Sequence, residues 1–237
     1  EILEKSDLSF NNLYLVASEK SAGKRIKFKN KEIVIENLED YDFSKAEITF
    51  FAAGREVAKN WAPKAAKKTI VIDNSSFFRM QKNVPLVVPE VNPEALDKHE
   101  NIIANPNCST MQMVLVLKPL HDEYKINRVV VSTYQAVSGA GKAPMDELIS
   151  QTKEYLDGNK VKSKNFTKQI AFNLIPHIDV FDKDGYTKEE LKMTNETKKI
   201  LDNKIEVTAT CVRVPVRTGH SESINVEFDN TYKFENI

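Results

Sequence analysis

Cys108 is the residue of this sequence best suited to act as a nucleophile. It lies between a strand-like stretch, residues 102–104, and a helix-like stretch that begins near residue 111. A cysteine at a helix N-terminus is stabilised as a thiolate by the helix dipole and by free backbone N–H groups, which are also able to hold the oxyanion of a tetrahedral intermediate. A small buried hydrophobic residue, the commonest role of a free cysteine, fits the same position equally well. Cys211 lies inside an alternating strand and is expected to have that second role.

A glycine-bearing loop is the second candidate. Residues 135–142 (QAVSGAGK) follow a predicted strand and precede a predicted helix. Such a loop lets the backbone approach a ligand closely, and Gln135 is able to orient a carbonyl group by hydrogen bonding. A plain glycine-containing turn explains the same residues, because their spacing matches neither common phosphate-binding fingerprint.

Charged residues supply the remaining candidate chemistry. Arg213 and His220 flank a break between two predicted strands. An arginine is able to clasp a carboxylate through two parallel hydrogen bonds, and a histidine titrates near neutrality. Arg79 is suited to bind an anion or to remain solvated. Glu189 and Lys192 lie three residues apart on a predicted helix, which normally makes an exposed ion pair worth roughly a few tenths of a kcal/mol.

These candidates need a framework, and the first half of the chain alternates strand-like and helix-like segments. Strands are predicted at residues 13–17, 48–53, 69–73, 86–88 and 102–104, with a hairpin over residues 26–35 and a helix over residues 55–68. In that helix Val57, Trp61 and Ala65 recur every four residues on one face. Near-continuous apolar strands separated by helices indicate a parallel sheet covered on both faces.

The pattern changes after Cys108. A helix limited or kinked by Pro119 is predicted over residues 111–120, then a strand over residues 128–134. Helical spacing returns over residues 145–156, and a further helix opens at Thr187, where Glu190 completes a capping box. Residues 207–216 and 221–228 alternate in the manner of antiparallel strands. We therefore predict two domains, residues 1–108 and residues 109–237.

Composition excludes several classes of protein. The 34 basic and 34 acidic side chains cancel, so the chain carries no electrostatic footprint for nucleic acid. No apolar stretch approaches the roughly 20 residues that span a bilayer, so no membrane partner is expected. The two cysteines form no disulfide framework, which fits a reducing cytoplasm. His99, His121 and His177 show no ligand spacing, so no metal site is predicted.

Several segments, taken together and in order, resemble the aspartate-semialdehyde dehydrogenase family. They are residues 71–76, 84–92, 105–110 (NPNCST), 132–142, 170–181 and 211–222, which extend over nearly the whole chain. The resemblance implies an α/β fold, in which a Rossmann-like, parallel-sheet nucleotide-binding domain is followed by an α+β catalytic and dimerisation domain. It also implies a homodimer formed through the second domain, and a place in lysine, threonine and methionine biosynthesis.

The family's reaction implies a role for each candidate residue. Cys108 matches the nucleophile that expels phosphate from aspartyl phosphate and holds the aspartyl group as a thioester, to which NADPH delivers hydride. His220 matches the acid/base residue, and Gln135 matches the residue that orients the acyl group. The binding residues are Arg213 for the α-carboxylate, Glu189 for the amino group, Asn107 for the substrate, Arg79 and Lys192 for the leaving phosphate, Ser138 and Gly139 for the nicotinamide side, and Ser18, Lys20 and Ser21 for the 2′-phosphate of NADP.

Departures from the family concern mainly the nucleotide site. The family has a first strand and a Gly-rich turn that cradle the pyrophosphate, and a last stretch that returns to the nucleotide domain. This sequence opens partway along the following helix and stops before that last stretch, so a chain truncated at both ends is expected to bind NADPH poorly and to lack reductase turnover. Lys20 stands where arginine is usual, and Arg55 stands where a small residue usually follows Gly54.

Other functions remain open at this point. N-acetyl-glutamyl-phosphate reductase also uses a cysteine thioester, but its substrate has a blocked amino group, for which an acidic partner such as Glu189 has no use. A non-catalytic remnant or a dimer-forming module of the same family is a further alternative. A cysteine hydrolase would require His220 to lie beside Cys108, which nothing in the linear sequence indicates.

Overall fold

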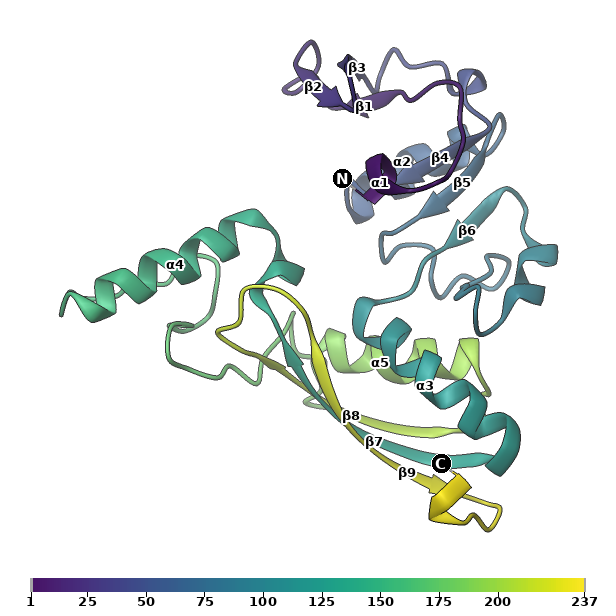
Figure 1. The fold of residues 1–237 in the computed structure, drawn as a ribbon, viewed down its shortest axis with the longest axis vertical. Helices are drawn as coiled ribbons and strands as arrows, with labels where there is room; N and C mark the ends of the chain where they lie inside the picture. The colour runs from purple at the N-terminus through teal and green to yellow at the C-terminus, as the bar shows by residue number, and fades with distance from the viewer. Residues whose placement is uncertain (1, 237) are drawn as a thin grey trace. The chain divides into compact units, whose positions relative to one another are not determined.

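The computed structural model describes residues 2–236, which form two compact units (Figure 1). The first unit contains the chain up to Pro85 together with Lys98–Ala104, and the second contains Leu86–Asp97 and the chain from Asn105 onward. The boundary predicted between residues 108 and 109 remains a prediction. No helix among residues 2–236 combines the length and the apolar character that crossing a bilayer requires.

The first sheet of the first unit follows α1 (Ile2–Lys5) and has the order β1-β3-β2. β1 (Leu15–Ala17) runs parallel to β3 (Lys31–Asn37), and β2 (Arg25–Phe28) pairs with β3 in the antiparallel sense. The predicted hairpin is therefore confirmed. Its turn contains Lys29 at φ 50°, in the left-handed region.

A second sheet in this unit consists of three parallel strands. β5 (Ile70–Asp73) lies between β4 (Ile48–Phe51) and β6 (Ile102–Ala104), which confirms the predicted parallel sheet. The short η1 (Phe43–Lys45) precedes it, and η2 (Pro93–Lys98) precedes β6.

One helix of this unit, α2 (Arg55–Ala65), contacts β4 and β5. Its buried residues are Ala58, Ala62 and Ala65, so Val57 and Trp61 do not form the core face. Small alanines allow close packing, while Trp61 lies against the Lys64 ammonium, 4.1 Å from the ring centroid.

The predicted coverage of this sheet on both faces is wrong for β4. Ile48 and Phe50 are 50% and 67% exposed. They alternate along β4 with Thr49 and Phe51, which are more deeply buried, so only one face of this strand is covered within the described part of the unit.

The apolar run Leu86 to Val88 is buried but does not form a strand. The Asn92 side chain replaces strand partners, because its amide donates to the Leu86 carbonyl at 2.9 Å and its oxygen accepts the Val88 N–H at 2.9 Å. Within the run, Leu86 makes a single β-bridge, and the preceding Pro85 carbonyl accepts the Ala104 N–H at 2.9 Å. The apolar run thus predicted burial correctly, but no full strand forms.

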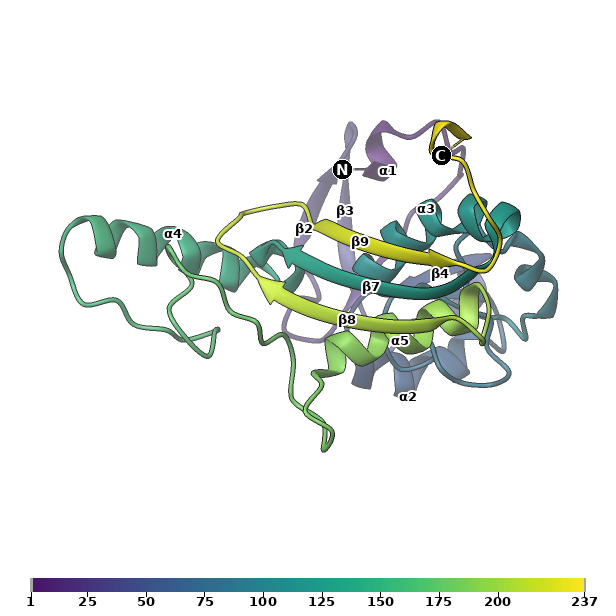
Figure 2. The ribbon, with the colours of Figure 1, turned by 90° about the horizontal axis from the view of Figure 1, so that it is seen from below.

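The second unit is built on a mixed sheet (Figure 2). β7 (Ile126–Gln135) lies at its centre, with β8 (Glu206–Arg213) parallel on one side and β9 (Ser221–Phe228) antiparallel on the other. The prediction of antiparallel strands is confirmed for β9 and wrong for β8, which pairs with β7 in the parallel sense. Alternation along a strand shows that one face is buried and does not reveal the neighbouring strand.

Two helices, α3 (Cys108–Tyr124) and α5 (Lys188–Ile200), cover one face of this sheet. The core between them is lined by Met113, Leu117, Val129, Val131, Met193, Ala209 and Cys211, among others. α5 opens with the predicted capping box, since Thr187 and Glu190 exchange hydrogen bonds. Side chains on the other face, such as Thr208, Thr210, Ser223 and Asn225, are exposed and polar.

A separate small core lies beyond the sheet. The turn η3 (Val137–Ala140) and α4 (Lys142–Leu156) follow β7 directly, and Val137 and Leu148 pack with Ile170, Ala171 and Ile175. α4 extends away from the layer of α3 and α5 (Figure 1). A last turn, η4 (Phe234–Asn236), follows β9.

Candidate active site

Cys108 is the first residue of α3, and Asn107 caps that helix. The Asn107 side chain accepts the backbone N–H groups of Ser109 at 3.0 Å and Thr110 at 3.2 Å. It thereby satisfies two of the four free donors at the helix N-terminus. Glu196 of α5 also holds this residue, since its carboxylate accepts the Asn107 N–H at 2.6 Å. The start of α3 is therefore held by α5.

The Cys108 thiol is exposed, but it is less acidic than the sequence predicts. The surrounding protein reduces its hydration, and together with the Glu189 carboxylate this raises the pKa of Cys108 above its usual value. The N–H groups of the first turn and the Ser109 hydroxyl act in the opposite direction and are outweighed. The expectation of a thiolate stabilised by the helix N-terminus is therefore wrong, because the reduced hydration of the thiol and a carboxylate from α5 together outweigh the helix dipole.

Glu189 connects the elements around Cys108. Its carboxylate accepts hydrogen bonds from the Asn107 amide at 2.8 Å, the Gln135 amide at 3.3 Å and the Lys192 ammonium at 3.0 Å. Burial raises the pKa of Glu189, but Lys192 and the amide donors lower it further, so the net shift is downward and the group is ionised at neutral pH. The side chain of Glu189 is only 8% exposed, so this pair is not the exposed helix pair that the spacing predicted.

Lys192 is shared between two carboxylates. Its ammonium donates to Glu189 and, at 3.1 Å, to Asp179. Burial lowers the pKa of Lys192, but the two carboxylates raise it further and the net shift is upward. The Lys192 ammonium therefore stays charged between two ionised carboxylates.

Arg213 and His220 both bind Ala136, at the end of β7. The buried Arg213 guanidinium donates to the Ala136 carbonyl at 2.7 Å, and Nδ1 of His220 accepts the Ala136 N–H at 3.1 Å. Because Nδ1 is an acceptor, the neutral ring carries its hydrogen on Nε2. Burial and the Arg213 charge lower the pKa of His220, so this neutral form prevails at pH 7.

Gly139 in η3 faces both basic side chains. A β-carbon at this position would lie 3.2 Å from Nε2 of His220 and 3.4 Å from Nη1 of Arg213. Its neighbour Ser138 donates its backbone N–H to the Arg217 carbonyl at 3.2 Å. The glycine thus leaves room for a ligand to reach these side chains along the η3 backbone.

The second unit contains most of the predicted site residues. They are Asn107, Cys108, Gln135, Ser138, Gly139, Glu189, Lys192, Arg213 and His220. Gln135 and Arg213 are register partners across β7 and β8, and the Arg213 charge responds to both Glu189 and Cys108. These side chains therefore form one site.

The other predicted residues lie in the first unit. Arg79 is buried and donates to the Asn74 carbonyl at 3.2 Å. Ser18, Lys20 and Ser21 form the turn after β1, in which the Ser21 N–H donates to the Ser18 carbonyl at 2.8 Å. This turn lies at the carboxyl end of a parallel strand, the usual ligand-binding edge of such sheets.

Sequence reasoning missed three residues of the second unit. Ser109 accepts the Gln135 amide at 2.9 Å, Glu196 holds Asn107 as described, and Glu222 of β9 lies near the first turn of α3. Glu196 follows Glu189 by seven residues, so the period of the helix predicts that the two share a face. No comparable signal marked Ser109 or Glu222.

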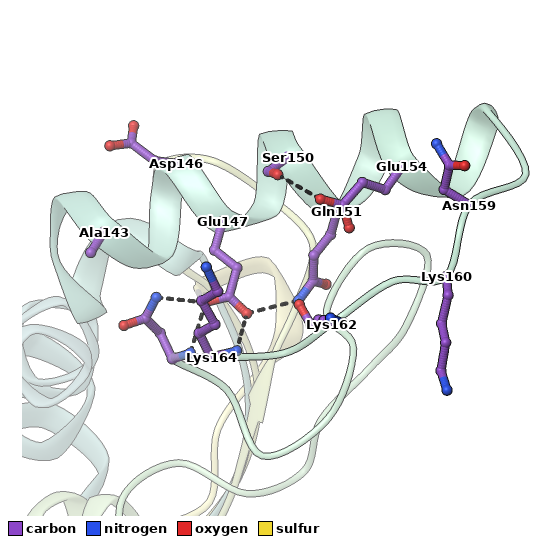
Figure 3. Close-up of a pocket in the computed structure, with 11 residues that line it drawn as sticks. Ala143, Asp146, Glu147, Ser150, Gln151, Glu154, Asn159, Lys160, Lys162 and Lys164 are labelled. Carbon is purple, nitrogen blue, oxygen red and sulfur yellow. Dashed lines mark hydrogen bonds between the residues drawn. The ribbon is translucent and has the colours of Figure 1, made fainter.

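A hollow of about 620 Å³ lies between α4 and the segment that follows it (Figure 3). Glu147 ties the two together, accepting the backbone N–H groups of Lys164 at 2.8 Å and Asn165 at 2.7 Å. None of the predicted site residues lines it. Among residues 2–236, no group of three or more His, Cys, Asp or Glu side chains is arranged to hold a metal ion.

Cys108 and Cys211 should differ strongly in reactivity. Cys108 is exposed, whereas Cys211 is fully buried and burial raises its pKa to about 12. We expect brief iodoacetamide treatment of the folded protein at neutral pH to alkylate Cys108 at least about tenfold faster, as read by mass spectrometry of the peptides. Denatured protein, in which both thiols should react alike, is the control. Equal labelling in the folded protein would remove the nucleophile assignment.

Comparison with known proteins places these features in context. Residues 1–99 match the NAD binding domain of semialdehyde dehydrogenases, and residues 117–237 match their dimerisation domain. The chain is 51% identical over 231 residues to aspartate-semialdehyde dehydrogenase 2 of Vibrio cholerae, covering 96% of this chain and 68% of that protein. It is 54% identical over 233 residues to aspartate-semialdehyde dehydrogenase of Aquifex aeolicus, with the same coverage of 96% and 68%.

Solved structures agree in fold. The crystal structure of aspartate semialdehyde dehydrogenase II complexed with ASA from Vibrio cholerae superposes with a TM-score of 0.97 at 49% identity, over 99% of this chain and 71% of that one. The structure of aspartate semialdehyde dehydrogenase with NADP from Candida albicans has a TM-score of 0.73 at 28% identity, over 98% of this chain and 68% of that one.

Proposed function

Because the chain belongs to the aspartate-semialdehyde dehydrogenase family, a family of oxidoreductases, we propose that it reduces L-aspartyl 4-phosphate to L-aspartate 4-semialdehyde through a thioester on Cys108. The pairing of an ionised Glu189 with a buried Arg213 around Cys108 carries this proposal. A substrate with a free α-amino group and an α-carboxylate needs one negative and one positive partner. The product would then serve lysine, threonine and methionine biosynthesis.

Each residue has a task in the first half of the reaction. Cys108 attacks the acyl carbon and expels phosphate, while Arg79 and Lys192 bind the phosphate oxygens. Arg213 clasps the α-carboxylate, Glu189 holds the ammonium group, and Asn107 supports the bound substrate. Splitting one difficult reduction into acylation and a later hydride transfer lowers each barrier.

Two residues act on the acyl group itself. Gln135 is held by Ser109 and Glu189, so its amide is oriented before the substrate arrives. His220 presents an Nε2–H donor, because Ala136 occupies its other nitrogen. We infer that this donor stabilises negative charge on the acyl oxygen. As the oxyanion collapses to the aldehyde, the C–S bond breaks and its electron pair returns to the Cys108 sulfur.

The nicotinamide cofactor fits the residues present. Gly139 leaves space beside His220 and Arg213 that a side chain would narrow, and we propose that Ser138 and Gly139 bind the nicotinamide side. When bound, the reduced nicotinamide supplies the hydride. Ser18, Lys20 and Ser21 offer two hydroxyls and one positive charge after β1, a donor set suited to the 2′-phosphate of NADP. We therefore propose NADP as the cofactor.

The cofactor-binding and catalytic roles divide between the two predicted domains. We propose that residues 1–108 bind the cofactor and that residues 109–237 carry catalysis and dimerisation. The exposed polar face of the β8-β7-β9 sheet offers a surface for a homodimer, and residues 117–237 match a dimerisation domain.

The proposal is tested in two steps. Freshly prepared L-aspartyl 4-phosphate should release phosphate stoichiometrically and leave an aspartyl group on Cys108, as read by mass spectrometry. In a version of the protein that includes the family's Gly-rich turn and last stretch, NADPH should then discharge that group as the semialdehyde, and NADH should do so more slowly. Absence of the adduct would overturn the proposal, whereas an adduct that NADPH does not discharge would overturn only the cofactor assignment.

The alternatives make different predictions in the same assay. N-acetyl-L-glutamyl 5-phosphate should give no adduct, because its blocked amino group leaves Glu189 without a partner. A cysteine hydrolase would need a hydrogen bond between His220 and Cys108. The side chains that act on the Cys108 sulfur are instead Glu189, through its charge, and Ser109, through a hydrogen bond, which disfavours a hydrolase.

A further inference from the structure

Glu222 is a buried carboxyl group that the proposed reaction does not use. It is opposite Thr133 in the register of β9 and β7, on the face of the sheet that α3 and α5 cover. Both of its carboxyl oxygens are buried without a hydrogen-bond partner of good geometry. Gln112 and Ser109 on α3 lie close enough to favour its charged form. A buried polar group left unsatisfied costs roughly 1–3 kcal/mol, so its presence needs an explanation.

Ser109 stands between this carboxyl group and the nucleophile. Its hydroxyl oxygen accepts the Gln135 amide at 2.9 Å, so its single hydrogen remains available for one acceptor. Two acceptors compete for that hydrogen. The Ser109 hydroxyl stabilises the ionised form of the Cys108 thiol and also the ionised form of the Glu222 carboxyl.

We propose that Glu222 is a positioning residue, which determines through Ser109 whether the Cys108 thiolate receives a hydrogen bond. An ionised Glu222 accepts the Ser109 hydrogen and leaves the sulfur without it. A neutral Glu222 donates its own proton to the Ser109 oxygen, and the Ser109 hydrogen then points to the sulfur. The relevance of this switch to turnover rests on the function proposed for Cys108.

The ionisation of Glu222 falls in the range where such a switch operates. Burial raises the pKa of Glu222 to about 7, so both forms are populated near neutrality. The titratable group that responds to its charge is Cys211 on β8, which also responds to Glu189 and Glu190 of α5. Cys108 on α3 is linked to Glu222 through Ser109. Cys211 does not compete for protons in this range, since its pKa is about 12.

The pH dependence of Cys108 alkylation tests the proposal. In Glu222→Gln the neutral side chain keeps its shape, so the Ser109 hydrogen stays directed at the sulfur at every pH. Relative to the unchanged protein, iodoacetamide should alkylate Cys108 at about the same rate near pH 6 and about three- to tenfold faster near pH 8.5, with the change centred near pH 7. Glu206→Gln, at the exposed start of β8, is the matched control and should show no such change.

A second variant shows whether the effect passes through Ser109. In a Ser109→Ala background, Glu222→Gln should change the alkylation rate by less than about twofold at any pH, because the hydrogen that Glu222 directs is gone. If Glu222→Gln changed the alkylation rate similarly with and without Ser109, the relay would be overturned. It would also be overturned if, with Ser109 present, the ratio of the two alkylation rates did not vary with pH. Circular dichroism and thermal unfolding of each variant verify that the fold is retained.

Alkylation requires no substrate, so the two proposals fail separately. If the ratio of alkylation rates varied with pH but no aspartyl adduct formed, the switch would be supported and the enzymatic function rejected. Adduct formation with a flat ratio would reject the switch alone. If Glu222→Gln does not fold, Ser109→Ala alone tests the relay. In the unchanged protein the Cys108 alkylation rate should show a step near pH 7, and Ser109→Ala should abolish that step.

Discussion

Cys108→Ala should lower the rate of phosphate release from L-aspartyl 4-phosphate by roughly 10⁴-fold or more, because no other group in the site is able to form the thioester. The thiol at the head of α3 is the only exposed cysteine thiol among the described residues. Rapid-mixing measurement of phosphate, with mass spectrometry for the aspartyl adduct, gives the rate.

Cys211→Ala is the matched control for this loss. Cys211 lies in the core, with its sulfur 3.7 Å from that of Met193. Its truncation should destabilise the fold by about 1 kcal/mol and leave acylation nearly unchanged. If Cys108→Ala instead kept more than a hundredth of the rate, the activation free energy would have risen by less than roughly 2.7 kcal/mol. Another nucleophile would then have to be sought.

Arg213→Lys should lower kcat/KM for acylation by roughly a hundredfold, about 2.7 kcal/mol of transition-state binding. The guanidinium is buried and already donates to the Ala136 carbonyl, so its remaining N–H groups are aligned for a carboxylate. A lysine keeps the charge but loses both the anchor and the second parallel hydrogen bond. The rate of adduct formation, measured as a function of substrate concentration, gives kcat/KM for each protein.

Arg217→Lys provides the comparison for this second prediction. Arg217 lies in the exposed segment between β8 and β9, and its backbone carbonyl accepts the Ser138 N–H. The exchange should change kcat/KM by less than about twofold. An effect of Arg213→Lys below about threefold would mean that Arg213 contributes charge alone.

Local signals in the sequence predicted local structure well. The capping box at Thr187 and the hairpin around Lys29 need only residues within a few positions of each other, and both are found. The prediction that Val57 and Trp61 lie on the buried face of α2 was wrong, because periodicity cannot distinguish a packed small residue from a half-exposed large one. Alanines form the actual contact surface of α2.

The electrostatics of the site could not be read from neighbouring residues. A helix N-terminus alone predicts an acidic thiol at Cys108, but reduced hydration, together with Glu189 from 81 positions away in the chain, raises the pKa of this thiol. Spacing likewise predicted the Glu189–Lys192 pair but not its burial, which depends on how α5 meets Asn107 and Gln135. The Ser109–Glu222 contact depends on strand register, which alternation leaves open.

The hydrogen bonds from α5 to the cap of α3 also determine at what stage of folding the Cys108 site forms. Asn107 is bound by side chains 82 and 89 residues further along the chain, and β7 acquires both of its neighbours only from residues beyond Glu206. During synthesis from the N-terminus, the cysteine is therefore made long before the groups that govern it. Closing such long loops carries the largest entropic penalty in folding. The nucleophile thus acquires its final environment only when nearly the whole second unit has left the ribosome.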